Sequence, residues 1–131
     1  MYTCQPDEIF VYGSNEAGIH GAGAAYDART KYGAVWGTGN GLSGRSYGIP
    51  TKDKNLRVLT LPQINFYVDE FIQFVINTPD KKFFITAIGT GLAGFKHSEI
   101  APMFKGLPDN CRTPPEWSEY VTYIVHPWQP A

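Results

Sequence analysis

A stretch of small residues at positions 13–25 has the composition of an anion-binding loop. It reads GSNEAGIHGAGAA and lies between a short apolar segment, EIFVY, and a segment of helical character. Glycine and alanine let backbone N–H groups approach a ligand without interference from larger side chains. The N-terminus of a following helix adds a dipole that attracts negative charge. We therefore interpret this loop as one wall of a phosphate-binding site, in preference to a glycine-rich turn that binds nothing.

A second glycine-rich segment, GTGLAG at positions 89–94, directly follows the strongly apolar segment KFFITAI. Its spacing matches the G-x-G-x-x-G fingerprint of Rossmann-type dinucleotide enzymes. That alternative also needs an acidic residue at the end of the next strand, and Asp109 has about the right separation but lies in the loop GLPDN. Two loops that converge on one diphosphate account for the pattern better, because a diphosphate offers several oxygens to two sets of amides.

A third glycine-rich segment, GTGNGLSG at positions 37–44, has no clear helix behind it. Loops of this composition serve either as flexible surface segments or as rims over a binding pocket. Both interpretations stay open from the sequence.

The residues that most often bind metal ions are scattered along the chain. The three histidines and two cysteines are His20, His97, His126, Cys4 and Cys111. Their spacing fits no metal site, so we expect two free thiols, no metal and no cofactor.

Composition predicts a single globular domain over residues 1–131. The chain is 43% hydrophobic and 18% charged, which is typical of a folded protein. Its formal net charge of −1 argues against binding of unmodified nucleic acid through a cationic surface. The chain has neither a run of the ~20 apolar residues that cross a bilayer nor the pattern of a secretory signal. We therefore expect a cytoplasmic protein with no membrane partner.

The rest of the pattern alternates between strands and helices. We expect strands at 8–12, 34–36, 47–50, 82–88 and 120–125. We expect helices at 24–33, between 60 and 77, and from about 98 to 104. The segment RVLTL at 57–61 is either a weak strand or the start of a helix. This order predicts an α/β fold, a three-layer α/β/α sandwich with a mixed, mostly parallel sheet.

The longest expected helix has clear signals at both ends. Thr60 and Gln63 have the spacing of a capping box, with Pro62 in the first turn. The apolar residues that recur at helical spacing are Ile64, Val68, Phe71, Ile72 and Val75. Asn77 and Pro79 then end the helix.

With both loops in view, the chain resembles the macrodomains, α/β/α modules that bind ADP-ribose. The parts that carry the resemblance are IFVYGSN, HGAGAA and FFITAIGTGLAGF, so that it covers about residues 8–105. It is most similar to the branch of the terminal ADP-ribose glycohydrolase and the DNA-de-ADP-ribosylating antitoxins, where a strand ends in a Thr-Lys pair like Thr51 and Lys52. It also resembles short stand-alone bacterial and phage proteins that share the GSN…HGAGAA and SY-IPTKD patterns.

The resemblance implies a role for each matching residue. Asn15 would contact the distal ribose, and Lys52 would act as nucleophile or electrostatic catalyst at the anomeric carbon. One wall of the ligand site would be formed by His20, Gly21, Ala22, Gly23 and Ala24. The other wall would be formed by Gly89, Thr90, Gly91, Leu92, Ala93 and Gly94, with Phe95 near the distal ribose or the adenine edge.

Two features depart from the family pattern. The Gly-Asp pair whose aspartate reads the adenine amine is not matched, and Asp7 or Glu8 is the nearest stand-in. The acid that the lysine-using branch carries in the second loop is replaced by Ala93, so that hydrolysis lacks its expected general acid/base. Its candidate substitutes are His20, Asp53, His97 and Glu99.

Three functions follow from these observations. The first is binding of ADP-ribose or a related NAD-derived nucleotide, with or without hydrolysis of an ADP-ribosyl linkage on protein or nucleic acid. The second is a non-catalytic reader or sequestering protein for such a signal, which Ala93 favours. The third is a Rossmann-type enzyme that prefers NADH to ADP-ribose. The two-loop interpretation predicts that Gly23→Glu and Gly91→Glu each abolish binding and leave the fold intact.

Overall fold

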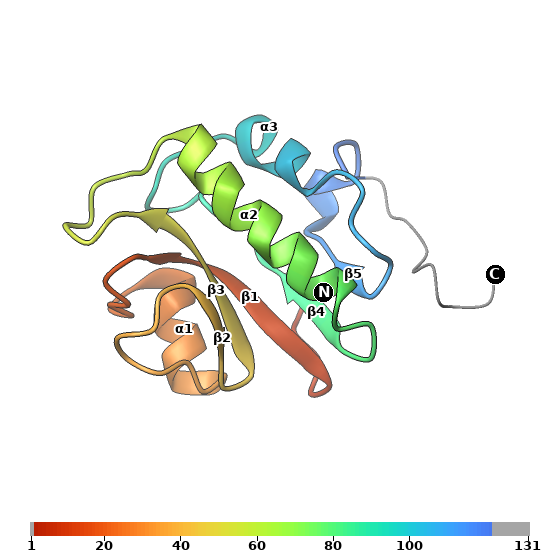
Figure 1. Cartoon of the computed structure of the whole chain (residues 1–131), viewed down its shortest axis with the longest axis horizontal. Coiled ribbons are helices and arrows are strands. Elements are labelled where there is room, and N and C mark those ends of the chain that lie inside the picture. Colours follow the sequence, from red (N-terminus) through yellow and green to blue (C-terminus); the bar gives the residue numbers. More distant parts are fainter. Residues whose placement is uncertain (1, 122–131) are drawn as a thin grey trace.

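A five-stranded sheet in the order β2-β3-β1-β4-β5 forms the middle layer of the molecule (Figure 1). The computed structural model describes residues 2–121. The strands are β1 (Glu8–Asn15), β2 (Gly41–Ser43), β3 (Ser46–Lys52), β4 (Lys82–Ile85) and β5 (Cys111–Arg112). Strands β3, β1, β4 and β5 run parallel, and β2 runs antiparallel to β3. The mixed, mostly parallel sheet that the sequence predicts is confirmed.

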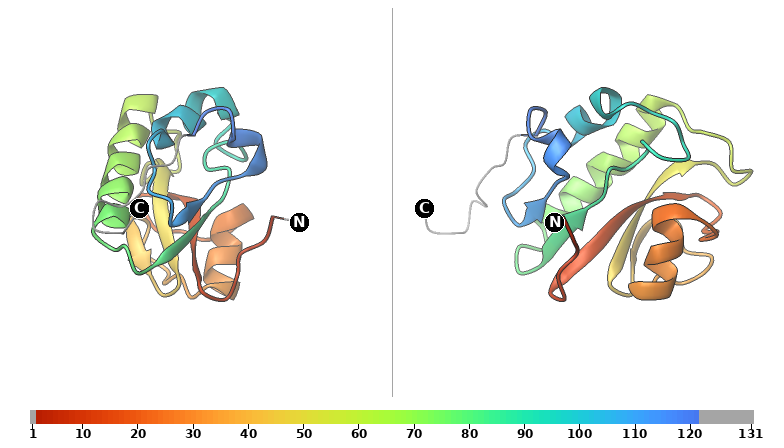
Figure 2. Two further views of the ribbon diagram at one scale, coloured as in Figure 1. Left: turned by 90° about the vertical axis from the view of Figure 1, so that its right-hand side faces the viewer. Right: turned by 180° about the vertical axis from the view of Figure 1, so that it is seen from behind.

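Helices cover both faces of this sheet, as Figure 2 shows. The first face is covered by α1 (Gly23–Lys31). The opposite face is covered by α2 (Leu61–Ile76), α3 (His97–Ile100) and the 3-10 turns Ala101–Phe104 and Pro115–Trp117. Side chains of β1 alternate between the two cores, because successive residues of a strand point to opposite faces. Ile9 and Val11 pack on the α2 side, whereas Phe10 and Tyr12 pack on the α1 side.

Helix α2 begins and ends where its sequence signals predict. The Thr60 hydroxyl accepts the Gln63 N–H, and the Gln63 side chain accepts the Thr60 N–H, which completes the capping box. Asn77 forms the C-cap. The fully buried residues of this helix are Ile64, Val68, Phe71 and Val75. Their 3-4 spacing places one apolar stripe against the sheet.

Two expected elements differ from the structure, and the sequence leaves a third segment open. Residues 34–36 form no strand, since Ala34 is buried while Val35 and Trp36 are exposed. Strand β4 stops at Ile85. The Thr86 N–H and hydroxyl still donate to the Val11 carbonyl oxygen, and the chain then turns, with the Ile88 N–H donating to the Thr86 carbonyl oxygen at 2.8 Å. The segment 57–61 combines its two predicted alternatives: Val58 forms an isolated bridge with Lys52, while Thr60 and Leu61 are the N-cap and the first residue of α2.

The C-terminal part of the chain also departs from expectation. The helix expected at 98–104 is split into α3 and a 3-10 turn, with Pro102 in the first turn of the latter. The strand expected at 120–125 lies outside the described residues except for its first two positions, which are not in a strand. Among the helices of residues 2–121, none has the length and apolar character needed to cross a membrane.

The order of the strands creates a crevice at the carboxyl ends of the parallel strands. The connection from β1 passes through α1 on one face, and the connection from β4 leads to α3 on the other. Because β1 and β4 are parallel neighbours, their following loops separate at their carboxyl ends. Open α/β sheets bind ligands at such a topological switch point.

Candidate functional site

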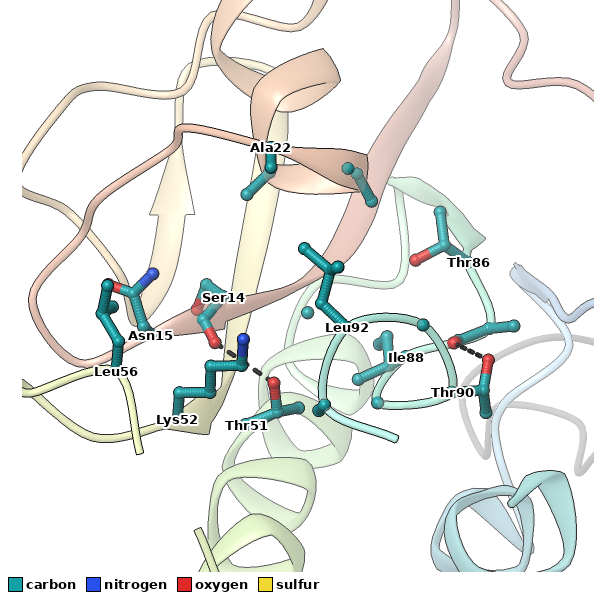
Figure 3. Close-up of a pocket in the computed structure, with 18 of the residues that line it drawn as sticks. Ser14, Asn15, Ala22, Thr51, Lys52, Leu56, Thr86, Ile88, Thr90 and Leu92 are labelled. Atoms are coloured by element: carbon teal, nitrogen blue, oxygen red, sulfur yellow. Dashed lines mark hydrogen bonds between the residues drawn. The ribbon is translucent and has the colours of Figure 1, made fainter. Parts of the chain in front are cut away.

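A cavity of about 580 Å³ lies at this switch point, within the usual size range of small-molecule sites (Figure 3). Four segments line it: the end of β1 with the loop and first turn of α1 after it, the end of β3, the turn after β3, and the loop after β4. The lining residues are Gly13, Ser14, Asn15, Ile19, Gly21, Ala22, Gly23, Ala24, Ala25, Thr51, Lys52, Leu56, Thr86, Ala87, Ile88, Gly89, Thr90, Gly91, Leu92 and Ala93. Both predicted glycine-rich loops therefore face one cavity.

The first loop presents the N-terminus of α1 to this cavity. Ala22 is the N-cap residue and supplies no side-chain cap. Tyr26 donates its N–H to the Ala22 carbonyl oxygen at 3.2 Å, but the N–H groups of residues 21–25 have no acceptor within the described part of the chain. Unpaired amides at a helix N-terminus carry partial positive charge, so this wall favours an anion.

The second loop turns sharply at two glycines. Gly89 and Gly94 have φ values of +79° and +81°, which only glycine adopts without strain. The Phe95 N–H donates to the Gly89 carbonyl oxygen at 2.9 Å and closes the loop. Within residues 2–121, the N–H groups of residues 91–93 find no acceptor, so they too are free to bind an anion.

Among the described residues that line the cavity, Lys52 is the single charged one. It ends β3, and its carbonyl oxygen accepts the Glu16 N–H at 2.9 Å. The adjacent Thr51 donates its hydroxyl to the Ser14 carbonyl oxygen at 3.3 Å. With one lysine and no carboxylate in the described lining, the electrostatics of the cavity favour a negatively charged ligand.

Asn15 lines the cavity and also braces the first loop. Its Nδ2 donates to the Ile19 carbonyl oxygen at 2.8 Å, and its Oδ1 accepts the Ile19 N–H at 2.9 Å. The side-chain amide therefore holds the loop closed through the backbone of Ile19. One N–H of the Asn15 amide remains available to a ligand.

Three residues that the sequence placed in the site do not line the cavity. His20 is fully buried behind the first loop, where its Nε2 lies 3.0 Å from the Thr38 carbonyl oxygen and 3.2 Å from the Tyr12 hydroxyl. Phe95 packs against the core on the α2 side, and Gly94 lies outside the lining. Gly94 and Phe95 come after the turn of the second loop, whereas His20 is held behind the first loop by Tyr12 and Thr38.

Burial makes His20 sensitive to acid. Its Nδ1 has no hydrogen-bond partner, and burial lowers its pKa below the ordinary 6.5. The folded state therefore favours the neutral ring. The stability that the neutral ring contributes is fully present above the unfolded pKa of 6.5, and it is lost as the pH falls from 6.5 toward the lower pKa of the folded state. We expect the urea midpoint to fall between about pH 7 and about pH 5, and to fall less in His20→Gln. An equal fall in both proteins would contradict this assignment.

The third glycine-rich segment packs behind the first loop instead of over the cavity. Gly37 donates its N–H to the Gly18 carbonyl oxygen at 2.9 Å, and the Ser14 hydroxyl donates to the Gly39 carbonyl oxygen. A Cβ at Gly18 or Gly39 would overlap the backbone of the other segment. The segment also contains β2, so it is neither a flexible loop nor a rim. Glycines in both segments are the sequence signal of this close backbone contact.

Three acidic residues that the sequence suggested for nucleotide binding lie far from the cavity. They are Asp109, required by the Rossmann alternative, and Asp7 and Glu8, suggested as readers of the adenine amine. Asp109 precedes β5 and therefore lies at the amino ends of the parallel strands, whereas the cavity lies at their carboxyl ends. Glu8 begins β1 at that same end and pairs with Arg112 at 2.6 Å, while Asp7 pairs with Lys82 at 3.1 Å. None of these acids reaches the cavity.

The candidate substitutes for the absent acid also lie outside the lining. Asp53 accepts the N–H groups of Asn55 and Arg57 within its own turn. Glu99 accepts the Lys96 N–H and caps α3. His97 accepts the Trp117 indole N–H at 2.8 Å. The described lining of the cavity therefore contains neither a carboxylate nor an imidazole.

Several lining residues escaped the sequence analysis. Thr86, Ala87 and Ile88 were expected in a strand but form the turn that opens the second loop. Leu56 lines the cavity from a loop that carries no sequence signal for binding.

No family model and no curated protein matches the chain. A solved structure of a protein of unknown function from Bacteroides thetaiotaomicron is similar over 91% of this chain and 87% of that chain, with a TM-score of 0.54 and 16% sequence identity. At that identity the similarity concerns the α/β/α fold alone.

Proposed function

We propose that this cavity binds ADP-ribose or a related NAD-derived nucleotide through its diphosphate. The observation that carries the proposal is that two loops with unpaired amides meet at one cavity, where Lys52 is the single charged residue of the described lining. Backbone amides and a helix N-terminus suit phosphate oxygens, because they supply several donors without a competing acceptor.

The apolar part of the lining suits the remainder of such a ligand. Ile19, Leu56, Ile88 and Leu92 provide carbon surface around the polar loops. Nucleotide sites commonly combine an apolar lining with a few convergent polar groups. The same proposal places the protein in the cytoplasm, where its two unpaired cysteines remain reduced.

Calorimetric titration with ADP-ribose tests the proposal, with NAD, AMP and ADP as comparison ligands. We expect saturable binding of ADP-ribose that is tighter than binding of AMP, because AMP lacks the diphosphate and the distal sugar. An absence of heat with all four ligands would contradict the proposal and leave the loops without a nucleotide function.

Binding without turnover is the form of the proposal that the lining favours. Hydrolysis of an ADP-ribosyl bond needs a group that protonates the leaving atom or activates water, and no carboxylate lies in the described lining. A reader or sequestering protein needs only affinity, so we expect ADP-ribose to be recovered unchanged after long incubation.

Hydrolysis is the second candidate, favoured by the position of Lys52 in the cavity. In this version the neutral Lys52 amine forms a bond to the anomeric carbon as the bond from that carbon to the modified group breaks, and the departing atom takes up the proton that the amine loses. Water then cleaves the new carbon–nitrogen bond, which releases ADP-ribose and regenerates the lysine. We expect Lys52→Ala to abolish release of ADP-ribose from an ADP-ribosylated substrate and to weaken binding by about tenfold, as for a lost phosphate-type contact. Lys54→Ala, an exposed lysine outside the lining, is the matched control. Activity that survives Lys52→Ala would exclude lysine-based catalysis.

A further inference from the structure

Leu56 combines a strained backbone with a position at the cavity. Its φ of 62° is the one positive value of any non-glycine residue in the described part of the chain. Its side chain lines the cavity and is 46% exposed. Bulky residues rarely adopt this left-handed conformation, so the leucine needs a physical explanation.

The local turn explains the backbone conformation but not the residue type. The Asp53 carboxylate accepts the N–H groups of Asn55 and Arg57 at 2.8 and 3.0 Å. The Leu56 N–H donates to the Asp53 carbonyl oxygen at 3.0 Å, and the Asp53 N–H donates to the Arg57 carbonyl oxygen at 2.8 Å. Glycine or asparagine at position 56 would satisfy the same turn with less strain.

Packing of the core does not explain the leucine either. Neither apolar core, on the α1 side or on the α2 side, includes Leu56. A side chain that is half exposed and outside both cores returns little stability to the fold. Leucine is therefore unfavourable in this turn, and its packing in the free protein does not offset the cost in stability.

The position of Leu56 at the cavity suggests that its side chain contacts a bound ligand. Figure 3 shows Leu56 at one end of the cavity together with Asn15 and Lys52, whereas Thr86 and Thr90 lie at the other end. ADP-ribose carries a nucleoside on one side of its diphosphate and a distal sugar on the other, so a ligand whose diphosphate lies along the glycine loops extends one of these two groups toward Leu56. An apolar wall there favours carbon surface, such as the face of a sugar, over another charged group.

We infer that Leu56 is a specificity-determining residue, whose side chain packs against the distal sugar of the ligand and favours ADP-ribose over ligands that end at the diphosphate. This inference rests on the proposed function. Leu56 supplies affinity by removing its own apolar surface and that of the sugar from water when the ligand binds.

Leu56→Asn is the decisive variant, because asparagine has a similar size and tolerates the left-handed conformation. We expect ADP-ribose to bind about tenfold more weakly to it, as one apolar contact is lost, and ADP to bind with nearly unchanged affinity. Leu42→Asn is the matched control, since Leu42 is 47% exposed on β2 and lies outside the lining. This control should bind both ligands as the natural protein does.

Urea unfolding without ligand separates this role from a structural one. We expect the midpoints of Leu56→Asn and Leu56→Gly to equal or exceed that of the natural protein, because both relieve the strained φ. A marked fall in both midpoints, or equal loss of affinity for ADP-ribose and ADP, would overturn the inference. Binding of ADP-ribose by the natural protein with an unchanged affinity in Leu56→Asn would overturn the inference alone, whereas no binding by the natural protein would overturn the proposed function as well.

Discussion

Gly91→Glu is expected to abolish binding of ADP-ribose while the protein stays folded. Gly91 lies in the second loop with a backbone conformation open to any residue, and a Cβ there meets nothing within 4 Å. A glutamate is therefore accommodated without strain, and its carboxylate is placed beside the site of the diphosphate. Juxtaposed like charges cost several kcal/mol, so we expect binding to weaken by more than about a hundredfold.

Two companion variants make the result specific. Gly91→Gln has almost the same size without the charge, so we expect most of the affinity to remain. Gly21→Glu places the same charge on the first loop, at a position where a Cβ also meets nothing within 4 Å. Titration calorimetry measures the affinity, and circular dichroism checks the fold. Retained affinity in both glutamate variants would contradict the two-loop site.

Gly21 is a better probe of the first loop than Gly23, which the sequence suggested. Gly23 has a φ of +59°, and it is the first residue of α1. A glutamate there strains the start of the helix, so loss of binding would not separate charge from structure.

Gly39→Ala is expected to lower the free energy of unfolding by about 3 kcal/mol, at the upper end of the cost of overpacking. A Cβ at Gly39 would overlap the Asn15 carbonyl oxygen and would lie 3.1 Å from the Gly18 amide nitrogen. The third glycine-rich segment then has to move away from the first loop. Because Asn15 lines the cavity, we expect ligand affinity to fall as well.

Gly21→Ala is the matched control for this prediction. Position 21 has room for a methyl group and no left-handed backbone, so alanine restricts the unfolded chain without a clash. We expect its free energy of unfolding to equal or exceed that of the natural protein by up to about 1 kcal/mol. Urea unfolding followed by tryptophan fluorescence measures both variants. Equal stability of Gly39→Ala and the natural protein would show that the two segments are not tightly packed.

The long helix and the alternation of elements were determined by the sequence alone. Thr60, Gln63 and the apolar stripe of α2 act through residues at most four positions apart, so their pattern is legible without tertiary information. The apolar segments of β1 and β4 likewise predicted buried parallel strands. The two glycine-rich loops were recognisable for the same reason, since each is a continuous segment between a strand and a turn or helix.

Contacts between distant segments were decided only by the tertiary structure. His20 was expected to bind ligand, but Tyr12 and Thr38 hold its ring beneath the loop. The position of Thr86 after β4 depends on its bonds to the Val11 carbonyl oxygen, and the packing of the third glycine-rich segment depends on Gly18. Such contacts join residues separated by many positions, and no local propensity encodes them.

The composition of the cavity shows the same division. The sequence by itself determined two sets of backbone amides that suit a diphosphate, because each loop is one continuous segment of small residues that can be recognised without tertiary information. The family resemblance had suggested Lys52, but only the fold brings Leu56 to the cavity and leaves Asp109 and Glu8 at the opposite end of the strands. The physical reason is that strand order and direction, which arise from pairing between distant segments, determine which loop ends lie together.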